Sequence, residues 1–126
     1  MPAVVDASAV LALVLQEPGS NAVEPYVGTG LLSVVNYSEV VARLCDRGAS
    51  AELIQTQIDV LQMTLVGFDQ ETAFNAGLLR EMTKHAGLSF ADRACLATAA
   101  RLGVPAVTAD QAWSELDIGI EIELIR

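Results

Sequence analysis

Residues 3–15 read Ala-Val-Val-Asp-Ala-Ser-Ala-Val-Leu-Ala-Leu-Val-Leu, an apolar run that a single acid, Asp6, divides into two parts. Residues 3–5 are short and apolar, which predicts a buried strand. Residues 8–15 have helical spacing up to the Pro-Gly break that follows them. A strand that passes directly into a helix is the unit of parallel α/β sheets. This stretch therefore indicates the fold class.

The same alternation of strand and helix continues to the end of the chain. Further strands are predicted at residues 31–34, 65–68, 105–108 and, as an edge strand, 120–125. Helices are predicted at residues 21–27, 36–47, 69–84, 90–102 and 112–116, with one more after a Ser50 cap; the helix after Asp69 is expected to insert Phe74, Leu78 and Met82 into the core. We therefore predict an α/β three-layer sandwich, a mostly parallel twisted sheet of four or five strands flanked by helices, in one domain spanning residues 1–126.

The composition excludes several classes of protein. Of the 126 residues, 52% are hydrophobic and 18% charged, which excludes intrinsic disorder. The net charge of −9 argues against a broad basic nucleic-acid surface and against binding to anionic membranes. Because the apolar fraction is high for so small a domain, we expect a partner chain to cover part of the surface.

The cysteines, the histidine and the N-terminal segment point to an intracellular protein without a zinc site. Cys45 and Cys95 are expected to be buried and His85 to lie at the surface, and no CxxC motif exists. No basic residue precedes the first apolar run, and Asp6 interrupts it, so we expect no signal peptide. The apolar run of residues 7–15 is too short to span a membrane, and a cytoplasmic location is expected.

Four acids occupy equivalent places in the predicted fold. Asp6 ends the first strand, Glu39 and Asp92 fall in the first turns of two helices, and Asp110 follows the fourth strand. Strand C-termini and crossover-helix N-termini share one edge of a parallel sheet, so these carboxylates should converge. Each acid alone could be a helix cap worth ~0.3–1 kcal/mol, since Asn36 to Glu39 and Ser89 to Asp92 have capping-box spacing.

Convergence of four like charges indicates a cation. Carboxylates without histidine or cysteine select Mg²⁺, with Mn²⁺ able to substitute. Such an ion binds phosphate oxygens and activates water, which points to phosphodiester hydrolysis. A purely structural cation site is the alternative.

Four segments resemble the PIN-domain ribonucleases, most of all the VapC toxins of type II toxin–antitoxin systems. They are residues 4–11 (Val-Val-Asp-Ala-Ser-Ala-Val-Leu), 36–40 (Asn-Tyr-Ser-Glu-Val), 88–97 (Leu-Ser-Phe-Ala-Asp-Arg-Ala-Cys-Leu-Ala) and 107–110 (Val-Thr-Ala-Asp). The resemblance implies a Mg²⁺-dependent single-strand endoribonuclease that inhibits growth or translation when its antitoxin releases it. It further implies a homodimer and a VapB-type antitoxin whose basic C-terminal tail lies against the acids.

The resemblance also implies roles for individual residues. Asp6, Glu39, Asp92 and Asp110 would be catalytic and metal-binding, and Asp6 and Asp92 would be the firmest ligands. The hydroxyls of Ser8 and Thr108 would lie beside the metal, although helix capping explains Ser8 equally well.

The positions of the basic residues have two interpretations. Arg80, Lys84 and Arg93 are candidates for positioning RNA, against the alternative of solvated helix faces. For Arg43 and Arg47 we favour the solvated face, with a Glu39–Arg43 pair at i,i+4 spacing. Trp113 is predicted to pack its short helix against the sheet.

Two other functions remain open from the sequence, and a third is disfavoured by it. One is a non-toxin PIN nuclease that acts in RNA processing. Another is a catalytically inactive α/β interaction module. The third, a phospho-acceptor receiver domain, needs an acid pair after the first strand and a lysine after a later strand. Here Ala7 follows Asp6, and the only lysine, Lys84, falls in a helix.

Overall fold

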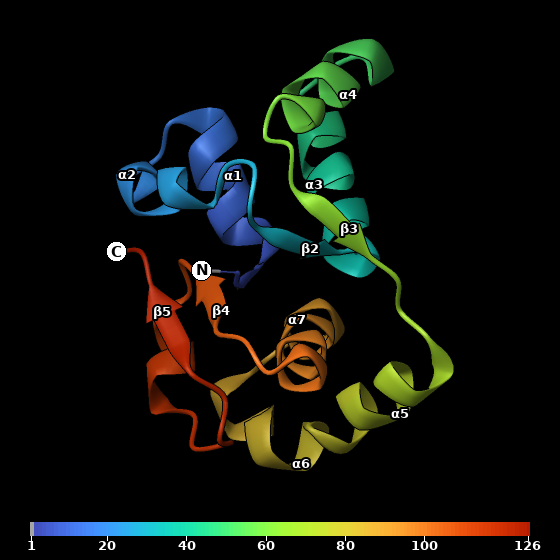
Figure 1. Ribbon diagram of the computed structural model, residues 1–126, viewed down its shortest axis with the longest axis vertical. Helices are drawn as coiled ribbons and strands as arrows, with labels where there is room; N and C mark the ends of the chain where they lie inside the picture. Colours follow the sequence, from blue (N-terminus) through green and yellow to red (C-terminus); the bar gives the residue numbers. More distant parts are fainter. Residues whose placement is uncertain (1) are drawn as a thin grey trace.

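In the computed structural model, which describes residues 2–126, five parallel strands form one sheet in the order β3-β2-β1-β4-β5 (Figure 1). The strands are β1 (Val4–Val5), β2 (Leu31–Ser33), β3 (Thr64–Val66), β4 (Ala106–Thr108) and β5 (Ile122–Leu124). The predicted parallel α/β sheet is confirmed, and its last strand lies at the edge. Because β1 and β4 are adjacent, the residues that follow them meet at one edge of the sheet.

Helices connect the strands and cover both faces of the sheet. They are α1 (Ala7–Leu15), α2 (Ser20–Val23), α3 (Val34–Asp46), α4 (Ala51–Asp59), α5 (Gln70–Leu78), α6 (Arg80–Thr83) and α7 (Phe90–Leu102), with 3₁₀ turns η1 (Glu24–Tyr26), η2 (Lys84–Ala86) and η3 (Gln111–Glu115). The helix α7 has the predicted bounds, and Ser50 and Asp69 cap α4 and α5 as predicted. Within residues 2–126, no helix has both the length and the apolarity needed to cross a membrane.

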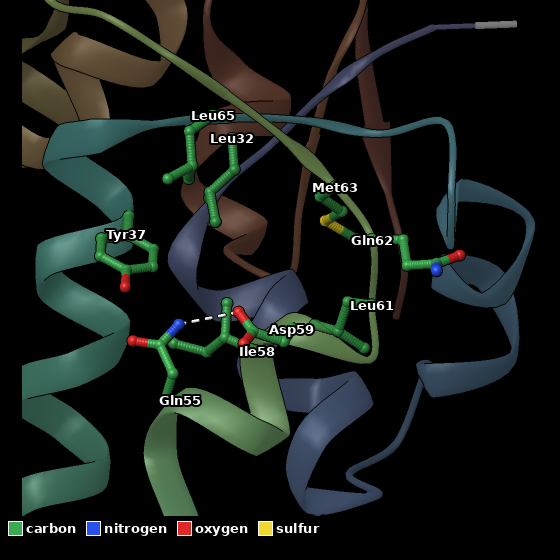
Figure 2. A pocket seen from close by; sticks show the side chains of 9 residues that line it. All are labelled: Leu32, Tyr37, Gln55, Ile58, Asp59, Leu61, Gln62, Met63 and Leu65. Carbon is green, nitrogen blue, oxygen red and sulfur yellow. Dashed lines mark hydrogen bonds between the residues drawn. The ribbon is translucent and has the colours of Figure 1, made fainter. Parts of the chain in front are cut away.

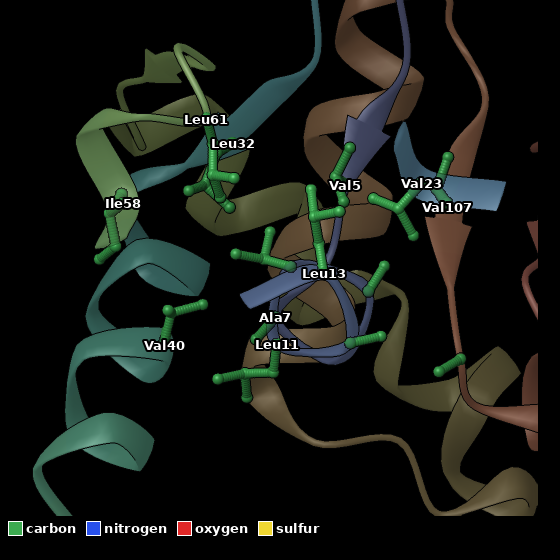
Figure 3. Packing of buried hydrophobic residues seen from close by; sticks show 14 of the residues in the cluster. Val5, Ala7, Leu11, Leu13, Val23, Leu32, Val40, Ile58, Leu61 and Val107 are labelled. Atoms are coloured by element: carbon green, nitrogen blue, oxygen red, sulfur yellow. The ribbon is translucent and has the colours of Figure 1, made fainter. Parts of the chain in front are cut away.

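Alternating strand residues build a separate core on each face of the sheet. Val5 and Val107 pack with α1, α3 and α4 on one face (Figure 3). Val4 packs on the opposite face with Leu96 of α7 and with Trp113, which is fully buried as predicted. This alternation produces the predicted three-layer sandwich.

The start of α3 differs from the prediction. The helix begins at Val34, where a strand residue was predicted, because the Ser33 hydroxyl caps it by accepting a hydrogen bond from the Val35 amide (3.2 Å). The predicted capping box from Asn36 to Glu39 is therefore wrong. Glu39 lies in the second turn of the helix and not in the first.

The orientation of the segment after Asp69 was also predicted wrongly. Phe74, Leu78 and Met82 are exposed. The buried residues of this segment are small: Thr72 and Ala76 of α5 and Thr83 of α6. The predicted single helix is also divided at Leu79. Cys95 is buried as expected, but Cys45 is exposed, contrary to the prediction.

Candidate active site

Asp6 is the most firmly held carboxylate at the C-terminal edge of the sheet. It follows β1, caps α1 and is only 3% exposed. Its Oδ1 accepts hydrogen bonds from the Ser8 hydroxyl (2.7 Å) and the Ala9 amide (2.9 Å), and its Oδ2 accepts one from the Thr108 hydroxyl (2.6 Å). Donors on both oxygens fix the plane of this carboxylate.

The two hydroxyls that bind Asp6 also hold the loop after β4. Ser8 Oγ accepts a hydrogen bond from the Ala109 amide (2.9 Å), and Thr108 Oγ1 accepts one from the Asp110 amide (3.0 Å). Asp110 is exposed, and its Oδ1 caps η3 by accepting from the Ala112 amide (2.9 Å). The fourth acid is thus joined to Asp6 through Thr108.

Asp92 is fixed by its place in the first turn of α7. Its Oδ2 accepts a hydrogen bond from the Ser89 amide (2.9 Å), while Ser89 Oγ accepts one from the Asp92 amide (3.1 Å). The predicted capping box is therefore present. A carboxylate held in this way needs little further ordering to bind a ligand.

Asn36 lies beside the acids, although sequence reasoning assigned it no role of its own beyond a helix cap and a place in the 36–40 segment. It is 1% exposed, and its Nδ2 donates to the Ala91 carbonyl in the first turn of α7 (3.0 Å). Interaction with the Asn36 side chain lowers the pKa of Glu39, one turn further along α3. Asn36 Oδ1 is buried without a hydrogen-bond partner. An asparagine beside a predicted acid was the only signal available in the sequence.

Three of the four acids influence a common region. Burial raises the pKa of Asp6 to about 6, against the effect of its three hydrogen bonds, and the charge of Asp92 raises it further. Burial, followed by the charge of Asp92, raises the pKa of Glu39. Burial also raises the pKa of the Cys95 thiol, with added effects from Asp6, Asp92 and Glu39. Asp6, which follows β1, and Glu39 of α3 therefore each lie close enough to Asp92 of α7 to be repelled by its charge.

The donor set fits a hydrated cation better than a closed metal cage. Throughout residues 2–126, no three acidic, histidine or cysteine side chains come close enough together to enclose a metal. Mg²⁺ keeps several waters and needs only one or two carboxylates from the protein. All the acids offer oxygen ligands, and a cation would relieve the repulsion between Asp6 and Asp92. These residues therefore fit Mg²⁺ or Mn²⁺.

The other predicted site residues lie in varied surroundings. Arg93 Nη1 donates to the Ala76 carbonyl (3.0 Å) and so joins α7 to α5. Lys84 pairs with Glu81 (2.9 Å), and Arg80 and His85 are exposed. The charged groups of Arg93 and Lys84 therefore already have partners within the chain, whereas Arg80 faces solvent.

A small pocket of about 130 Å³ lies between β2, α3 and α4 (Figure 2). Tyr37 and Leu32 line it, and Gln55 donates a hydrogen bond to Asp59 (2.7 Å) beside it. None of the four predicted acids lines this pocket, so it is distinct from the acidic edge.

Comparison with known proteins agrees with this architecture. The family model described as the PIN domain matches residues 3–119. Among solved structures, VapBC2 from Rickettsia felis bound to a promoter DNA fragment matches with a TM-score of 0.75 and 16% identity over 98% of each chain. DNA-bound VapBC from Salmonella typhimurium gives 0.75 and 15% over 100% of each chain.

A third structure, VapBC-5 from Mycobacterium tuberculosis, gives a TM-score of 0.60 and 22% identity over 99% of this chain and 98% of that one. At these identities the structural matches establish a shared fold. No curated protein matches the chain.

Proposed function

Since the chain belongs to the PIN domain family, whose members are nucleases, we propose that it is a metal-dependent endoribonuclease and the toxin of a VapBC-type pair. The observation that carries the proposal is that the charge of Asp92 reaches both Asp6 and Glu39 at one edge of the sheet and raises the pKa of each. Two buried carboxylates beside a third, Asp92, whose charge raises their pKa values are costly without a cation, and an oxygen-only set selects the ions that bind phosphate.

The proposed cofactor is Mg²⁺, with Mn²⁺ as a substitute. Asp6 and Asp92 would be its main protein ligands, with Glu39 and Asp110 contributing directly or through water. When bound, the ion supplies Lewis acidity and a water of lowered pKa.

The chain's own residues prepare this chemistry. Ser8 and Thr108 hold the Asp6 carboxylate in one orientation, so little ordering remains when the substrate binds. Burial and Asp92 raise the pKa of Glu39, which suits its carboxylate to accept a proton from the water that attacks phosphorus. The attack forms a new P–O bond and breaks the bond to the leaving ribose oxygen; Glu39 accepts the proton of the attacking water, and the leaving oxygen takes up a proton from solvent.

The proposed partners follow from the family and from the charge. The VapBC structures named above are toxin–antitoxin complexes, and a VapB-type antitoxin with a basic C-terminal tail suits the acidic edge. We propose that residues 1–126 act as one domain, that the chain forms a homodimer and that it acts in the cytoplasm. A free toxin of this kind would inhibit growth or translation by cutting RNA.

Incubation of the purified protein with total cellular RNA tests the proposal. With Mg²⁺ or Mn²⁺ we expect new RNA ends at a limited set of sites, and with chelator none, as read by sequencing of the ends. If diverse RNAs stay intact with either ion, the chain is an inactive interaction module. Induced expression in cells should also stop growth, and co-expression of a partner antitoxin should restore it.

A further inference from the structure

A hollow of about 360 Å³ lies between α1 and the C-terminal half of α3. Ser8, Leu11 and Leu15 of α1 form one wall, Arg43, Asp46 and Arg47 of α3 form the other, and Glu17 and Arg126 complete it. We call this set of residues the arginine hollow.

The arginine hollow joins the acidic edge at two points. Ser8, which lines it, donates directly to the Asp6 carboxylate (2.7 Å). Arg43, on the opposite wall, lies with its Nη2 3.8 Å from Glu39 Oε2. An extended ligand bound in the hollow would therefore reach the carboxylates of Asp6 and Glu39.

Positive charge is concentrated in this hollow. It holds three of the seven basic residues of a chain with a net charge of −9. Arg43 has 62% of its side chain exposed, whereas Arg126, 38% exposed, pairs with Glu17 (3.9 Å) and donates to the Pro18 carbonyl (2.8 Å). In the part of the chain that the structure describes, Arg47 forms no ion pair within 4.0 Å. Because Arg126 is held by Glu17, Arg47 and the exposed Arg43 supply the positive charge open to a ligand, and Asp46 is the remaining acid of the lining.

We propose that the arginine hollow binds a backbone phosphate of single-stranded RNA next to the bond that is cut, an inference that rests on the proposed nuclease function. Guanidinium groups bind phosphate through paired, charge-assisted hydrogen bonds. Contacts of this kind set the register of a strand, because they fix the backbone without reading the bases. Leu15, which is partly exposed, offers an apolar surface to the adjoining ribose or base. Arg43 and Arg47 thus serve the substrate and not only a solvated helix face.

Binding of a fluorescein-labelled 12-nucleotide oligouridylate, followed by fluorescence anisotropy, tests the proposal. Ca²⁺ replaces Mg²⁺ so that binding is measured apart from cutting. Arg47→Gln should weaken binding on the order of fivefold at 0.1 M salt. It should also reduce the slope of log K against log salt by about 0.7, the value for one lost phosphate contact. The double change R43Q/R47Q should reduce the slope by about twice as much.

The control matches the loss of charge at a distant place. Gln70→Glu, at an exposed position in the first turn of α5, changes the net charge by the same amount and should leave the salt slope unchanged. If the salt slopes of R47Q and R43Q/R47Q equal that of the wild type, or if the wild type does not bind the oligonucleotide, the proposal that the arginine hollow binds a phosphate is wrong.

Cutting of the same oligonucleotide with Mg²⁺ separates the two proposals. If the wild type cuts RNA while the arginine variants bind normally, only the hollow is wrong. If the variants lose the slope but no RNA is cut, the hollow stands and the nuclease function is wrong.

Discussion

The Thr108 hydroxyl donates to Oδ2 of Asp6 over 2.6 Å and so joins residues 102 positions apart in the chain. Thr108 Oγ1 also accepts a hydrogen bond from the Asp110 amide (3.0 Å). Thr108 therefore links two acids of the edge. The contact exists because β1 and β4 are adjacent and parallel and end together. The orientation of Asp6 thus depends on a strand near the opposite end of the sequence.

Replacing Thr108 with valine should therefore destabilise the protein. Thr108→Val keeps the shape but leaves Asp6 Oδ2 and the Asp110 amide without this partner, at a cost of about 1–3 kcal/mol in unfolding free energy. Urea unfolding measures the loss. Thr108→Ser is the matched control, because it retains the hydroxyl and should lose less. Equal stability of Thr108→Val and the wild type would show that the bond contributes nothing.

The buried Asp6 carboxyl should make the metal-free protein less stable as the pH rises. Its pKa of about 6 in the fold exceeds the ordinary 3.8, so the folded chain binds the proton more tightly. Its contribution is present below about pH 4 and is lost as the pH rises through 6, by roughly 3 kcal/mol at most. Urea unfolding in chelator at pH 4 and pH 7 should show this loss in the wild type.

Asp6→Asn is the control for this prediction, because its side chain does not titrate. The variant should lose less stability than the wild type between pH 4 and pH 7. Added Mg²⁺ should stabilise the wild type more at pH 7 than at pH 5, since the ion binds the deprotonated carboxylate. The same pH dependence in wild type and variant would mean that Asp6 does not titrate in this range.

Asn36 should matter for both stability and metal binding. Asn36→Ala removes the bond to the Ala91 carbonyl and should cost about 1–2 kcal/mol. Because this bond aligns α3 with α7, Mn²⁺ affinity measured by calorimetry should fall as well. Asn75→Ala, at an exposed position on α5, should change neither quantity by much. Unchanged Mn²⁺ affinity in Asn36→Ala would show that Asn36 does not contribute to metal binding.

The exposed apolar residues of α5 should lie in the contact between two copies of the chain. Phe74 is 67% and Leu78 60% exposed, although both were predicted to be buried. The double change F74S/L78S should convert a dimer of 13.3 kDa chains to monomers, as measured by light scattering. Leu53→Ser, at an exposed apolar residue of α4, should leave the dimer intact. A dimer that persists in F74S/L78S would place the contact elsewhere.

The elements that sequence reasoning predicted well are those fixed by neighbouring residues. The bounds of α7 follow from the Ser89 cap and Gly103, so Asp92 was placed correctly in its first turn. Asp6 likewise follows from a strand that passes directly into a helix. Hydrogen bonds between residues close in the chain define both positions, and the residue types that form such bonds can be recognised in the sequence.

The features that were missed depend on the packing partner. The helix α5 presents Thr72 and Ala76 to α7, whose alanine-rich surface suits close approach, so the larger apolar residues point outward. Asn36 has its role only because α3 lies against the first turn of α7. Periodicity within one helix contains no information on the neighbour that selects its buried face.

Cleavage of a defined RNA by the wild type and by Asp92→Asn tests the central claim most directly. Both proteins should melt at similar temperatures, because an asparagine oxygen can still accept the Ser89 amide. With Mg²⁺ the wild type should cut, and Asp92→Asn should fall to the level of the wild type in chelator. Cutting by folded Asp92→Asn at the wild-type rate would contradict a metal-dependent site at this edge of the sheet.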